Sequence, residues 1–385
     1  MKILIVSSLY FPYIKGGGEI STKLLAEGLN AKGFDVKVYS ISNKEKDDII
    51  NGVHVHRVKT SNIYWSFNAP SSKLKKIIWH LKDSYNIQSG NKFKEYISKN
   101  KPDVVITSTI EDISPYIWKI CKELKIKVIH ILRSYTLLCP KATMYKKDKL
   151  CKKQCLSCKI ITYPKKILSK YVDVVVGISE FILNEHTKYG YFPNAKQEVI
   201  YNPVEIPKIK IQKYNKNKKE MIFGFVGRIE KAKGIEFLLD NFSRLKLENV
   251  KLFIYGKGLT KEYENEIKQK YESNQIIFKG FKKPEEIYNE IDILIVPSLW
   301  NEPFGRIVPE ANSYEVPVLV SNRGGLPELV EEGKNGYVFD PDKEGDFEEK
   351  LKKIIEMKKN NSFSFDKEKF SLDEVIKKYE QILYL

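Results

Sequence analysis

Short apolar runs rich in β-branched residues alternate along this chain with segments whose apolar residues recur every three to four positions. The runs predict strands buried on both faces of a sheet, and the periodic segments predict the helices that cover it. In the first half the predicted strands are Lys2–Leu9, Asp35–Ile41, Val53–Val58, Asp103–Thr107, Lys127–Leu132 and Asp173–Gly177, with a helix over Thr22–Ala31. In the second half they are Met221–Val226, Val250–Tyr255, Gln275–Phe278, Asp292–Pro297, Val316–Ser321 and Gly336–Phe339.

This alternation predicts an α/β fold of two Rossmann-like, doubly wound domains that face a cleft. A length of 385 residues agrees, because a single core rarely grows beyond about 250–300 residues. The pattern is interrupted at Tyr201–Glu220, which contains Pro203 and Pro207 and shows no sustained periodicity. We therefore predict an N-terminal domain of residues 1–203 plus 367–385, a linker of residues 204–220 and a C-terminal domain of residues 221–366.

The chain ends in a predicted amphipathic helix. Ser371 and Glu374 have the spacing of a capping box. The apolar stripe that follows consists of Leu372, Val375, Ile376, Tyr379, Ile382 and Leu383. Such a stripe must pack on something, so we expect this helix to return to the N-terminal domain.

The chain is strongly basic, with 66 Lys and Arg against 49 Asp and Glu and a net charge of +17. Lys141–Lys170 contains ten lysines and one aspartate, and Lys208–Lys219 contains six lysines and no acid. Such runs attract polyanions or anionic membranes, or are simply solvated surface. Composition alone leaves both interpretations open.

One predicted helix adds an apolar component to this charge. Ser72–Asp83 mixes Lys73, Lys75 and Lys76 with leucine, isoleucine and tryptophan, as in helices that lie at a membrane interface. The alternative is an ordinary amphipathic helix packed on the core. The interfacial interpretation, taken together with the Lys141–Lys170 run, predicts peripheral contact with an anionic membrane surface.

No run approaches the roughly 18 apolar residues that cross a bilayer. Met1–Tyr13 lacks a small-residue cleavage site and leads directly into Gly16–Glu19, so we interpret it as a buried strand rather than a signal peptide. We therefore expect a cytoplasmic protein, located peripherally at the inner face of the cell membrane if the basic segments bind lipid.

The segment Pro297–Gly325 carries the strongest chemical signal. Glu302 lies in the loop after a predicted strand, and Glu310 lies eight residues later inside a helix that we expect to begin near Gly305. Free N–H groups and the dipole at a helix N-terminus favour a phosphate. The two carboxylates would then bind hydroxyl groups on either side of that phosphate, as in a sugar and a ribose.

Two further loops follow predicted strands. In Gly227–Gly234, Arg228 and Lys233 can neutralise a departing diphosphate without a metal. Gly16-Gly17-Gly18-Glu19 allows backbone N–H groups to approach a phosphate closely. It is not a G-x-G-x-x-G fingerprint, and no acidic residue follows at the ribose-binding offset, which argues against a nicotinamide cofactor.

Together these motifs resemble the GT-B glycosyltransferases of group 4 (GT4), in the right order along almost the whole chain. The resemblance implies a retaining, metal-independent hexosyltransferase that needs no cofactor for catalysis. Its N-terminal domain would bind the acceptor, and its C-terminal domain would bind a nucleotide-diphosphosugar.

The resemblance also implies roles for individual residues. Arg228 and Lys233 would bind the diphosphate, Glu302 the donor sugar and Glu310 the ribose hydroxyls. The remaining implied donor-binding residues are Gly16, Gly17, Gly256, Gly258, Phe304, Gly305, Ile307 and Val308. No side chain is a convincing nucleophile, so the leaving phosphate itself would take the proton of the acceptor hydroxyl.

This chain departs from the family pattern at Arg133. Relatives often carry a histidine at this position near the transferred sugar, and an arginine cannot act as a base at neutral pH. The substitution leaves transfer feasible and puts the identity of the donor sugar in question. We interpret the neighbouring His130 as a core residue rather than a substitute.

Four cysteines lie in the Lys-rich insertion: Cys139, Cys151, Cys155 and Cys158. Four thiolates within twenty residues can form a structural zinc site. Only one pair has the common C-x2-C spacing, so zinc, disulfides and free thiols all stay open.

We therefore predict that a hexose-type sugar moves from a nucleotide-diphosphosugar to a hydroxyl of a lipid-linked or cell-surface glycan. A sugar-nucleotide epimerase of the same fold is the alternative within enzymes. A nucleic-acid-binding protein is the alternative outside them, but the basic runs lack interleaved aromatic residues and leave Glu302 and Glu310 unexplained. We expect no nucleic-acid partner.

Overall fold

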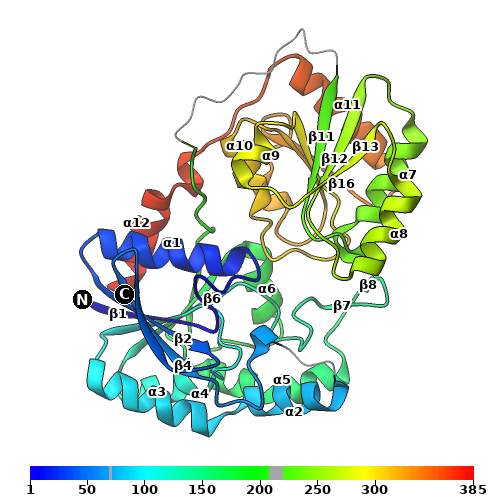
Figure 1. Ribbon diagram of the computed structural model, residues 1–385. Helices are drawn as coiled ribbons and strands as arrows, with labels where there is room; N and C mark the ends of the chain where they lie inside the picture. The colour runs from blue at the N-terminus through cyan, green and yellow to red at the C-terminus, as the bar shows by residue number, and fades with distance from the viewer. Residues whose placement is uncertain (69–71, 208–219) are drawn as a thin grey trace. The chain divides into compact units, whose positions relative to one another are not determined.

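The computed structural model describes residues 1–68, 72–207 and 220–385 of the chain (Figure 1). The chain divides into two compact units. The first unit comprises Met1–Met144, Cys151–Pro203 and Leu372–Leu385, and the second comprises Tyr145–Leu150 and Val204–Ser371. The basic run Lys208–Lys219 and most of the expected linker lie outside the described residues.

The first unit is built on a sheet of eight strands in the order β10-β9-β6-β5-β1-β2-β4-β3. Its strands are β1 (Lys2–Ser7), β2 (Asp35–Ser42), β3 (Lys46–Ile50), β4 (Val53–Lys59), β5 (Val104–Thr107), β6 (Lys127–Leu132), β9 (Val174–Gly177) and β10 (Lys196–Val199). All pairings are parallel except that of β3 with β4. The pattern of apolar runs missed β3 and β10 because these edge strands are short and carry charged residues.

Within the described residues, seven helices cover this sheet: α1 (Gly17–Ala31), α2 (Lys73–Ser84), α3 (Ile87–Asn100), α4 (Tyr116–Glu123), α5 (Leu156–Leu168), α6 (Glu180–Thr187) and α12 (Leu372–Leu383). The C-terminal helix α12 packs beside α1, as expected (Figure 1). A Cβ at Gly28 would lie 2.7 Å from Ile376, so a glycine allows this close approach. Lys127 Nζ also donates to the Ile382 carbonyl at 2.7 Å.

The second unit contains a six-stranded, wholly parallel sheet in the order β13-β12-β11-β14-β15-β16. Its strands are β11 (Met221–Val226), β12 (Val250–Tyr255), β13 (Ile276–Gly280), β14 (Ile293–Val296), β15 (Val318–Ser321) and β16 (Gly336–Phe339). Its helices are α7 (Ile235–Leu245), α8 (Lys261–Tyr271), α9 (Pro284–Tyr288), α10 (Ile307–Ser313) and α11 (Asp346–Lys359). The prediction of two Rossmann-like α/β units is thus confirmed.

Two boundaries differ from the sequence-based division. The hairpin of β7 (Tyr145–Lys146) and β8 (Lys149–Leu150) belongs to the second unit, although the sequence placed it inside the first domain. The second unit also continues to Ser371 rather than ending at residue 366, since Phe370 is buried in it and its carbonyl accepts from Val204 N–H at 3.0 Å. Pattern alone could not locate these contacts.

Each sheet has a switch point where the strand order reverses. It lies between β1 and β5 in the first unit and between β11 and β14 in the second. Ligands of open α/β sheets bind beyond the carboxyl ends of strands at such points. No helix in the part of the chain that the structure describes has the length and hydropathy to cross a membrane.

Candidate active site

The loops after β11 and β14 contact each other at the switch point of the second unit. Leu299 N–H donates to the Ala232 carbonyl at 2.9 Å. Gly234 has φ +73°, and a Cβ there would lie 1.8 Å from the Pro297 carbonyl oxygen. Only glycine permits both this backbone conformation and this approach, so the loop carrying Lys233 is held against the loop carrying Glu302.

Lys233 and Glu302 form an ion pair across these loops. Lys233 Nζ lies 2.6 Å from Glu302 Oε1, and the Glu302 side chain is 9% exposed. The same oxygen accepts hydrogen bonds from Ser298 Oγ at 2.6 Å and Trp300 Nε1 at 2.9 Å. Lys233 Nζ also lies 5.2 Å from the centroid of the Trp300 ring. The sequence identified the lysine and the glutamate but missed Ser298 and Trp300, although both lie in the segment that it singled out.

The backbone of Glu302 is fixed from a third loop. Gly324 has φ +64°, and a Cβ there would lie 2.1 Å from the Glu302 carbonyl oxygen. Gly325 N–H donates to that carbonyl at 2.8 Å. The Gly324-Gly325 pair is therefore explained by the packing of this turn.

Glu310 lies in the first turn of α10 with both carboxylate oxygens in use. Arg306 Nε donates to Oε1 at 2.5 Å, and the Tyr288 hydroxyl donates to Oε2 at 3.3 Å. Burial and the nearby Glu310 carboxylate raise the pKa of Tyr288, so its hydroxyl keeps its proton. The sequence missed Arg306 and Tyr288 as partners of this residue.

The helix of Glu310 begins at Ile307 rather than near Gly305 and has seven residues. Gly305 has φ +99° and would place a Cβ 2.3 Å from Leu326, so its conformation belongs to the turn before the helix. Phe304 and Val308 are buried, and Ile307 is half-buried. Their implied backbone contacts with a donor stay a prediction.

Arg228, and the two glycines expected to border the nucleotide base, contact groups of the chain itself in the structure. Arg228 is 57% exposed and pairs with Glu230 at 3.0 Å. Gly256 has φ +138°, and a Cβ there would lie 1.8 Å from the Gly227 carbonyl oxygen. Gly258 N–H donates to Glu264 Oε2 at 2.8 Å. Packing accounts for Gly256, and its role at a nucleotide base stays a prediction.

In the first unit, α1 begins at Gly17 directly after Gly16, as the glycine motif suggests. Gly16 N–H donates to Glu19 Oε2 at 2.9 Å, so a carboxylate of the chain already uses one amide of this turn. Arg133 lies beside it: its Nε donates to Ser108 Oγ at 2.7 Å, and a Cβ at Gly18 would lie 3.6 Å from its Cδ. The arginine that departs from the family pattern thus lies close to the glycine turn.

His130 is a core residue, as expected. It is 3% exposed, and its Nδ1 lies 2.8 Å from Thr107 Oγ1. Burial lowers its pKa to about 3, so the imidazole is neutral at physiological pH.

Cys158 lies beside two of the other cysteines of the cluster. Cys158 Sγ is 3.1 Å from Cys155 Sγ and 3.9 Å from Cys139 Sγ. Burial raises the pKa of the Cys158 thiol, with the neighbouring cysteines adding to the shift. Among the described residues, no group of three or more His, Cys, Asp or Glu has the arrangement of a metal site. A structural zinc at Cys139, Cys151, Cys155 and Cys158 stays a sequence-based prediction, and nothing below depends on it.

Comparison with known proteins adds the family context. Residues 15–207 match the family model described as Glycosyltransferase Family 4, and residues 208–368 match Glycosyl transferases group 1. An uncharacterized 42.6 kDa protein in the cps region of Klebsiella pneumoniae is 36% identical over 333 residues, which cover 86% of this chain and 87% of that protein. The capsular polysaccharide biosynthesis glycosyltransferase CapM of Staphylococcus aureus is 33% identical over 156 residues, or 37% of this chain and 39% of that protein.

Solved structures share the fold across the whole chain. Sucrose-phosphate synthase from Thermosynechococcus elongatus has a TM-score of 0.75 at 18% identity, covering 100% of this chain and 98% of that one. HepE from Anabaena in complex with UDP and glucose has a TM-score of 0.69 at 17% identity, covering 100% of this chain and 99% of that one.

Proposed function

The chain belongs to the GT-B glycosyltransferases with family 4 and group 1 domains, and from this premise we propose its reaction. It transfers a hexose-type sugar, with retention of anomeric configuration, from a nucleotide-diphosphosugar to a hydroxyl of a lipid-linked or cell-surface glycan. A relative from a cps region and the capsular CapM protein support a role in glycan biosynthesis.

The pair of Lys233 and Glu302 is the observation that carries this proposal. It lies at the switch point of the second sheet, where the fold favours a ligand. The Lys233 ammonium group neutralises the departing diphosphate, with Arg228 as the second cation. The Glu302 carboxylate accepts a hydrogen bond from a hydroxyl of the donor sugar. Because Glu302 holds Lys233 in place beforehand, little reorganisation accompanies the reaction.

The proton of the acceptor hydroxyl passes to the leaving phosphate. As the bond between the anomeric carbon and the phosphate oxygen breaks, negative charge develops on that oxygen. The acceptor oxygen forms its bond to the anomeric carbon on the same face of the sugar. Retention then needs no covalent enzyme intermediate. No metal takes part in this scheme, since Lys233 and Arg228 supply the positive charge.

A thermal-shift panel of UDP, GDP and ADP sugars tests the donor half. A ligand that binds only the folded state raises the melting temperature. HepE crystallised with UDP-glucose, which makes UDP sugars the first choice for this chain. Glu302→Gln should weaken the shift given by the sugar nucleotide more than the shift given by the nucleoside diphosphate alone, and equal shifts would contradict the sugar contact.

Incubation with the selected donor alone, followed by analysis of the products, separates transfer from epimerisation. A transferase leaves the sugar nucleotide intact or slowly hydrolysed, whereas an epimerase converts it to an isomer. Once an acceptor is found, proton NMR of the product reports its anomeric configuration, and an EDTA series reports metal dependence.

The membrane component of the proposal rests on α2 and α5, which lie side by side in the first unit (Figure 1). Each exposes an apolar stripe with helical spacing. The stripe residues are Leu74, Ile77, Ile78 and Leu81 on α2, and Leu156, Ile160, Tyr163 and Ile167 on α5, each between 45% and 73% exposed. We call these eight residues the α2–α5 stripe. Their exposure favours the interfacial interpretation of α2, whose other face carries the buried Trp79.

Charge favours an anionic lipid as the occupant of the α2–α5 stripe. Lysines flank it, including exposed Lys73, Lys75 and Lys159, and the one acid on these two helices is the buried Asp83. Apolar side chains with basic flanks are typical of helices that bind the interface of anionic membranes. An acceptor carried on a lipid would be presented at that surface.

Liposome flotation tests this component. The protein should float with vesicles containing phosphatidylglycerol, less with phosphatidylcholine alone, and less at high salt. The double variant Ile77→Ser with Ile160→Ser should reduce binding about tenfold, because each isoleucine loses apolar burial in the membrane. Ile49→Ser is the matched control, since Ile49 is 76% exposed on β3 outside the stripe. Equal flotation of all three proteins would remove the membrane component.

A further inference from the structure

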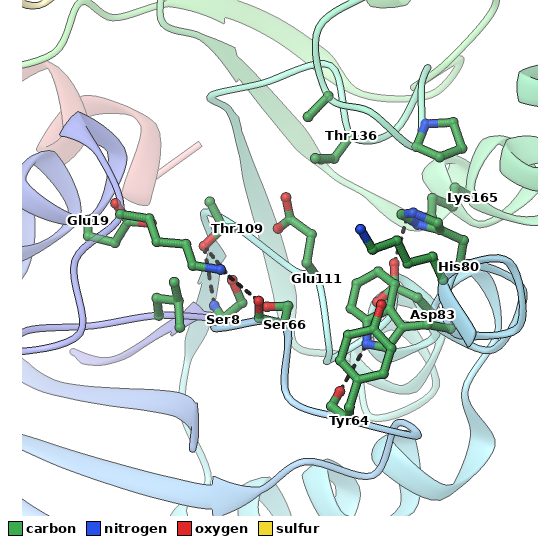
Figure 2. A pocket seen from close by; sticks show the side chains of 16 residues that line it. Ser8, Glu19, Tyr64, Ser66, His80, Asp83, Thr109, Glu111, Thr136 and Lys165 are labelled. Carbon is green, nitrogen blue, oxygen red and sulfur yellow. Dashed lines mark hydrogen bonds and ion pairs between the residues drawn. The ribbon is translucent and has the colours of Figure 1, made fainter. Parts of the chain in front are cut away.

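The first unit contains a cavity of about 370 Å³ at its own switch point (Figure 2). Ser8 and Leu9, after β1, and Thr109 and Glu111, after β5, form its floor. These are the two strands between which the order of the sheet reverses. The general rule for open α/β sheets therefore points to a ligand here, and the volume lies near the small end of the range for ligand pockets.

The walls of the cavity differ in chemistry. Tyr64 and Trp79 form an aromatic side, with ring centroids 5.8 Å apart and planes at 28°. Ser8, Thr109 and Thr136 supply hydroxyl groups around it. One apolar aromatic wall and a ring of short polar groups suit a sugar ring, which has apolar C–H faces and hydroxyl edges.

The formal charges of the side chains around the cavity balance. Three lysines, Lys15, Lys76 and Lys165, face three acids, Glu19, Asp83 and Glu111. Lys165 is already paired with Asp83 at 2.7 Å, and Lys15 Nζ donates to the Ser66 carbonyl at 2.6 Å. His80 completes the lining, and burial lowers its pKa, so it adds no charge at neutral pH. A neutral ligand fits this balance better than a phosphate or a carboxylate.

Glu111 is the group that lacks a partner. Its Oε2 is fully buried and has no hydrogen-bond partner within the described ranges 1–68, 72–207 and 220–385. Figure 2 shows its carboxylate directed into the space between Thr109 and His80. Burial raises its pKa, with Asp83 adding to the shift and Lys165 opposing it. A buried acceptor left unsatisfied costs free energy, and a hydroxyl group donated by a ligand would remove that cost.

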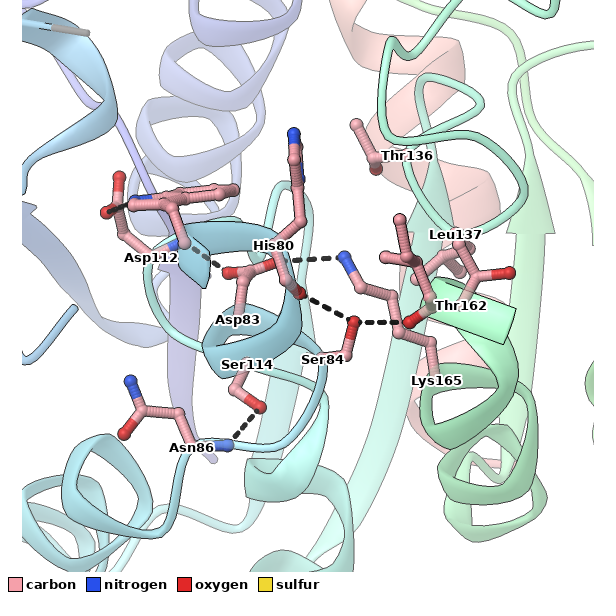
Figure 3. A network of polar contacts seen from close by, with 12 residues as sticks. His80, Asp83, Ser84, Asn86, Asp112, Ser114, Thr136, Leu137, Thr162 and Lys165 are labelled. Carbon is pink, nitrogen blue, oxygen red and sulfur yellow. Dashed lines mark hydrogen bonds and ion pairs between the residues drawn. The ribbon is translucent and has the colours of Figure 1, made fainter. Parts of the chain in front are cut away.

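A network of polar contacts includes Asp112, the residue that follows Glu111 in the chain (Figure 3). The Asp83 and Lys165 side chains are 0% and 5% exposed, and their ion pair joins α2 to α5. Asp83 Oδ1 also accepts from Asp112 N–H at 2.8 Å, and Asp112 Oδ1 accepts from Trp79 Nε1 at 3.2 Å. This network fixes the loop after β5 and the aromatic wall before any ligand arrives.

We propose that this cavity binds one neutral pyranose ring of the acceptor glycan, with Glu111 accepting a hydrogen bond from one of its hydroxyls. The assignment of the ring to the acceptor rests on the proposed glycosyltransferase function. The site itself is defined by the switch point, the aromatic wall and the unsatisfied carboxylate. Glu111 is a binding residue here and takes no part in bond breaking.

Saturation-transfer difference NMR on the full chain tests this site with defined probes. The probes are the neutral methyl glycosides of glucose, galactose and rhamnose, with methyl glucuronide as the charged comparison. At least one neutral glycoside should bind wild-type protein in the millimolar range. Glu111→Gln keeps the shape of the side chain but replaces one acceptor oxygen by an NH2 donor, and should weaken binding about tenfold.

Two further variants complete the design. Glu123→Gln makes the same chemical change on α4, outside the cavity lining, and should leave binding unchanged. His80→Gln alters the lining from α2 and should weaken binding severalfold, which gives a second readout if Glu111→Gln folds poorly. The thermal shift with nucleotide sugars should stay the same in all three variants.

The outcomes separate the two proposals. Three outcomes overturn the neutral-sugar site. They are glycoside binding that the Glu111 and His80 variants leave unchanged, the absence of binding by wild-type protein, and a preference for the glucuronide. In those cases an intact nucleotide-sugar shift leaves the proposed function standing. Conversely, Glu111-dependent glycoside binding without any nucleotide shift supports the cavity and removes the proposed function.

Discussion

The two units have the same kind of switch point but treat their carboxylates in opposite ways. In the second unit, Glu302 Oε1 accepts from three donors, and the loops around it are in close contact. In the first unit, Glu111 Oε2 has no partner among the described residues and faces a cavity. One carboxylate is satisfied by groups of the chain itself, and the other keeps an oxygen without a partner. Similar sheets can therefore hold a carboxylate either fully paired in a loop contact or partly unpaired beside a cavity.

The same two sites differ in how the chain assembles them. The pair of Lys233 and Glu302 comes from two short loops, each visible as a motif. The cavity of the first unit draws its lining from loops after β1 and β5 and from α2 and α5, far apart in the sequence. Four predictions test the physical basis of this contrast.

The largest effect is expected from the ion pair that braces the cavity. Asp83→Asn leaves the Lys165 charge buried and should lower the free energy of unfolding by about 3–5 kcal/mol. Adding Lys165→Met should recover part of this loss, because no unpaired charge is then buried. Urea denaturation measures both, and Glu95→Gln, which breaks the exposed pair with Lys99, is the control and should change stability little. A loss no larger than that of the control would mean that the pair does not brace the cavity.

The second effect concerns the prearranged site. Lys233→Ala should lower the rate of nucleoside diphosphate release from the donor about 10²–10³-fold, because the proposed neutralisation of the leaving group is lost. Initial rates with water or an identified acceptor measure this. Lys231→Ala removes a lysine that is 52% exposed in the same turn and should lower the rate far less. Equal losses for the two variants would assign the effect to net charge rather than to the pair with Glu302.

The third effect is a pH dependence within the bracing network. Burial raises the pKa of Asp112 to about 6, above its value of about 3.9 in the unfolded chain. The folded state therefore binds the proton more tightly, and the stability that this provides is present below about pH 4 and lost as the pH rises through about 6. The loss amounts to about 3 kcal/mol. The difference in unfolding free energy between wild type and Asp112→Asn should shrink over this range, and a pH-independent difference would contradict the shift.

The smallest effect concerns the turn behind Glu302. Gly324→Ala should cost about 1–3 kcal/mol more than Gly280→Ala, because the added methyl group meets the Glu302 backbone. Both glycines have a similar positive φ, but a Cβ at Gly280 would meet nothing within 4 Å. Comparing the thermal denaturation of the two variants separates the steric cost of the added methyl group from the conformational cost of the positive φ. Equal losses of stability would argue against the close approach.

Much of the second site was predictable from sequence because its residues are close in the chain. The loop after β14 carries Glu302, Ser298 and Trp300 within five positions. The two missed hydrogen-bond donors, Ser298 and Trp300, lie in the segment that the sequence analysis singled out. Serine and tryptophan in such a loop are as typical of a packing role as of a binding role, so their presence gave no signal. The start of α10 at Ile307 was missed because the positive φ of Gly305 delays the helix.

The first site gave no comparable signal. Glu111 lies in a short loop after β5, and nothing in its neighbours marks it as buried. Asp83 and Lys165 are 82 positions apart, so their pairing could not be inferred from either helix alone. The exposure of the α2–α5 stripe was equally hidden, since an amphipathic pattern gives the apolar face but not what that face meets.

The sequence by itself determined the alternation of buried strands and helices, the two Rossmann-like units, the return of the last helix and the candidates Lys233 and Glu302. These features depend on period, turn chemistry and contacts within short segments, all of which are local properties of the chain. Only the tertiary structure decided which carboxylate is satisfied and which is left open, because burial and hydrogen bonding depend on residues that the fold brings together from distant positions.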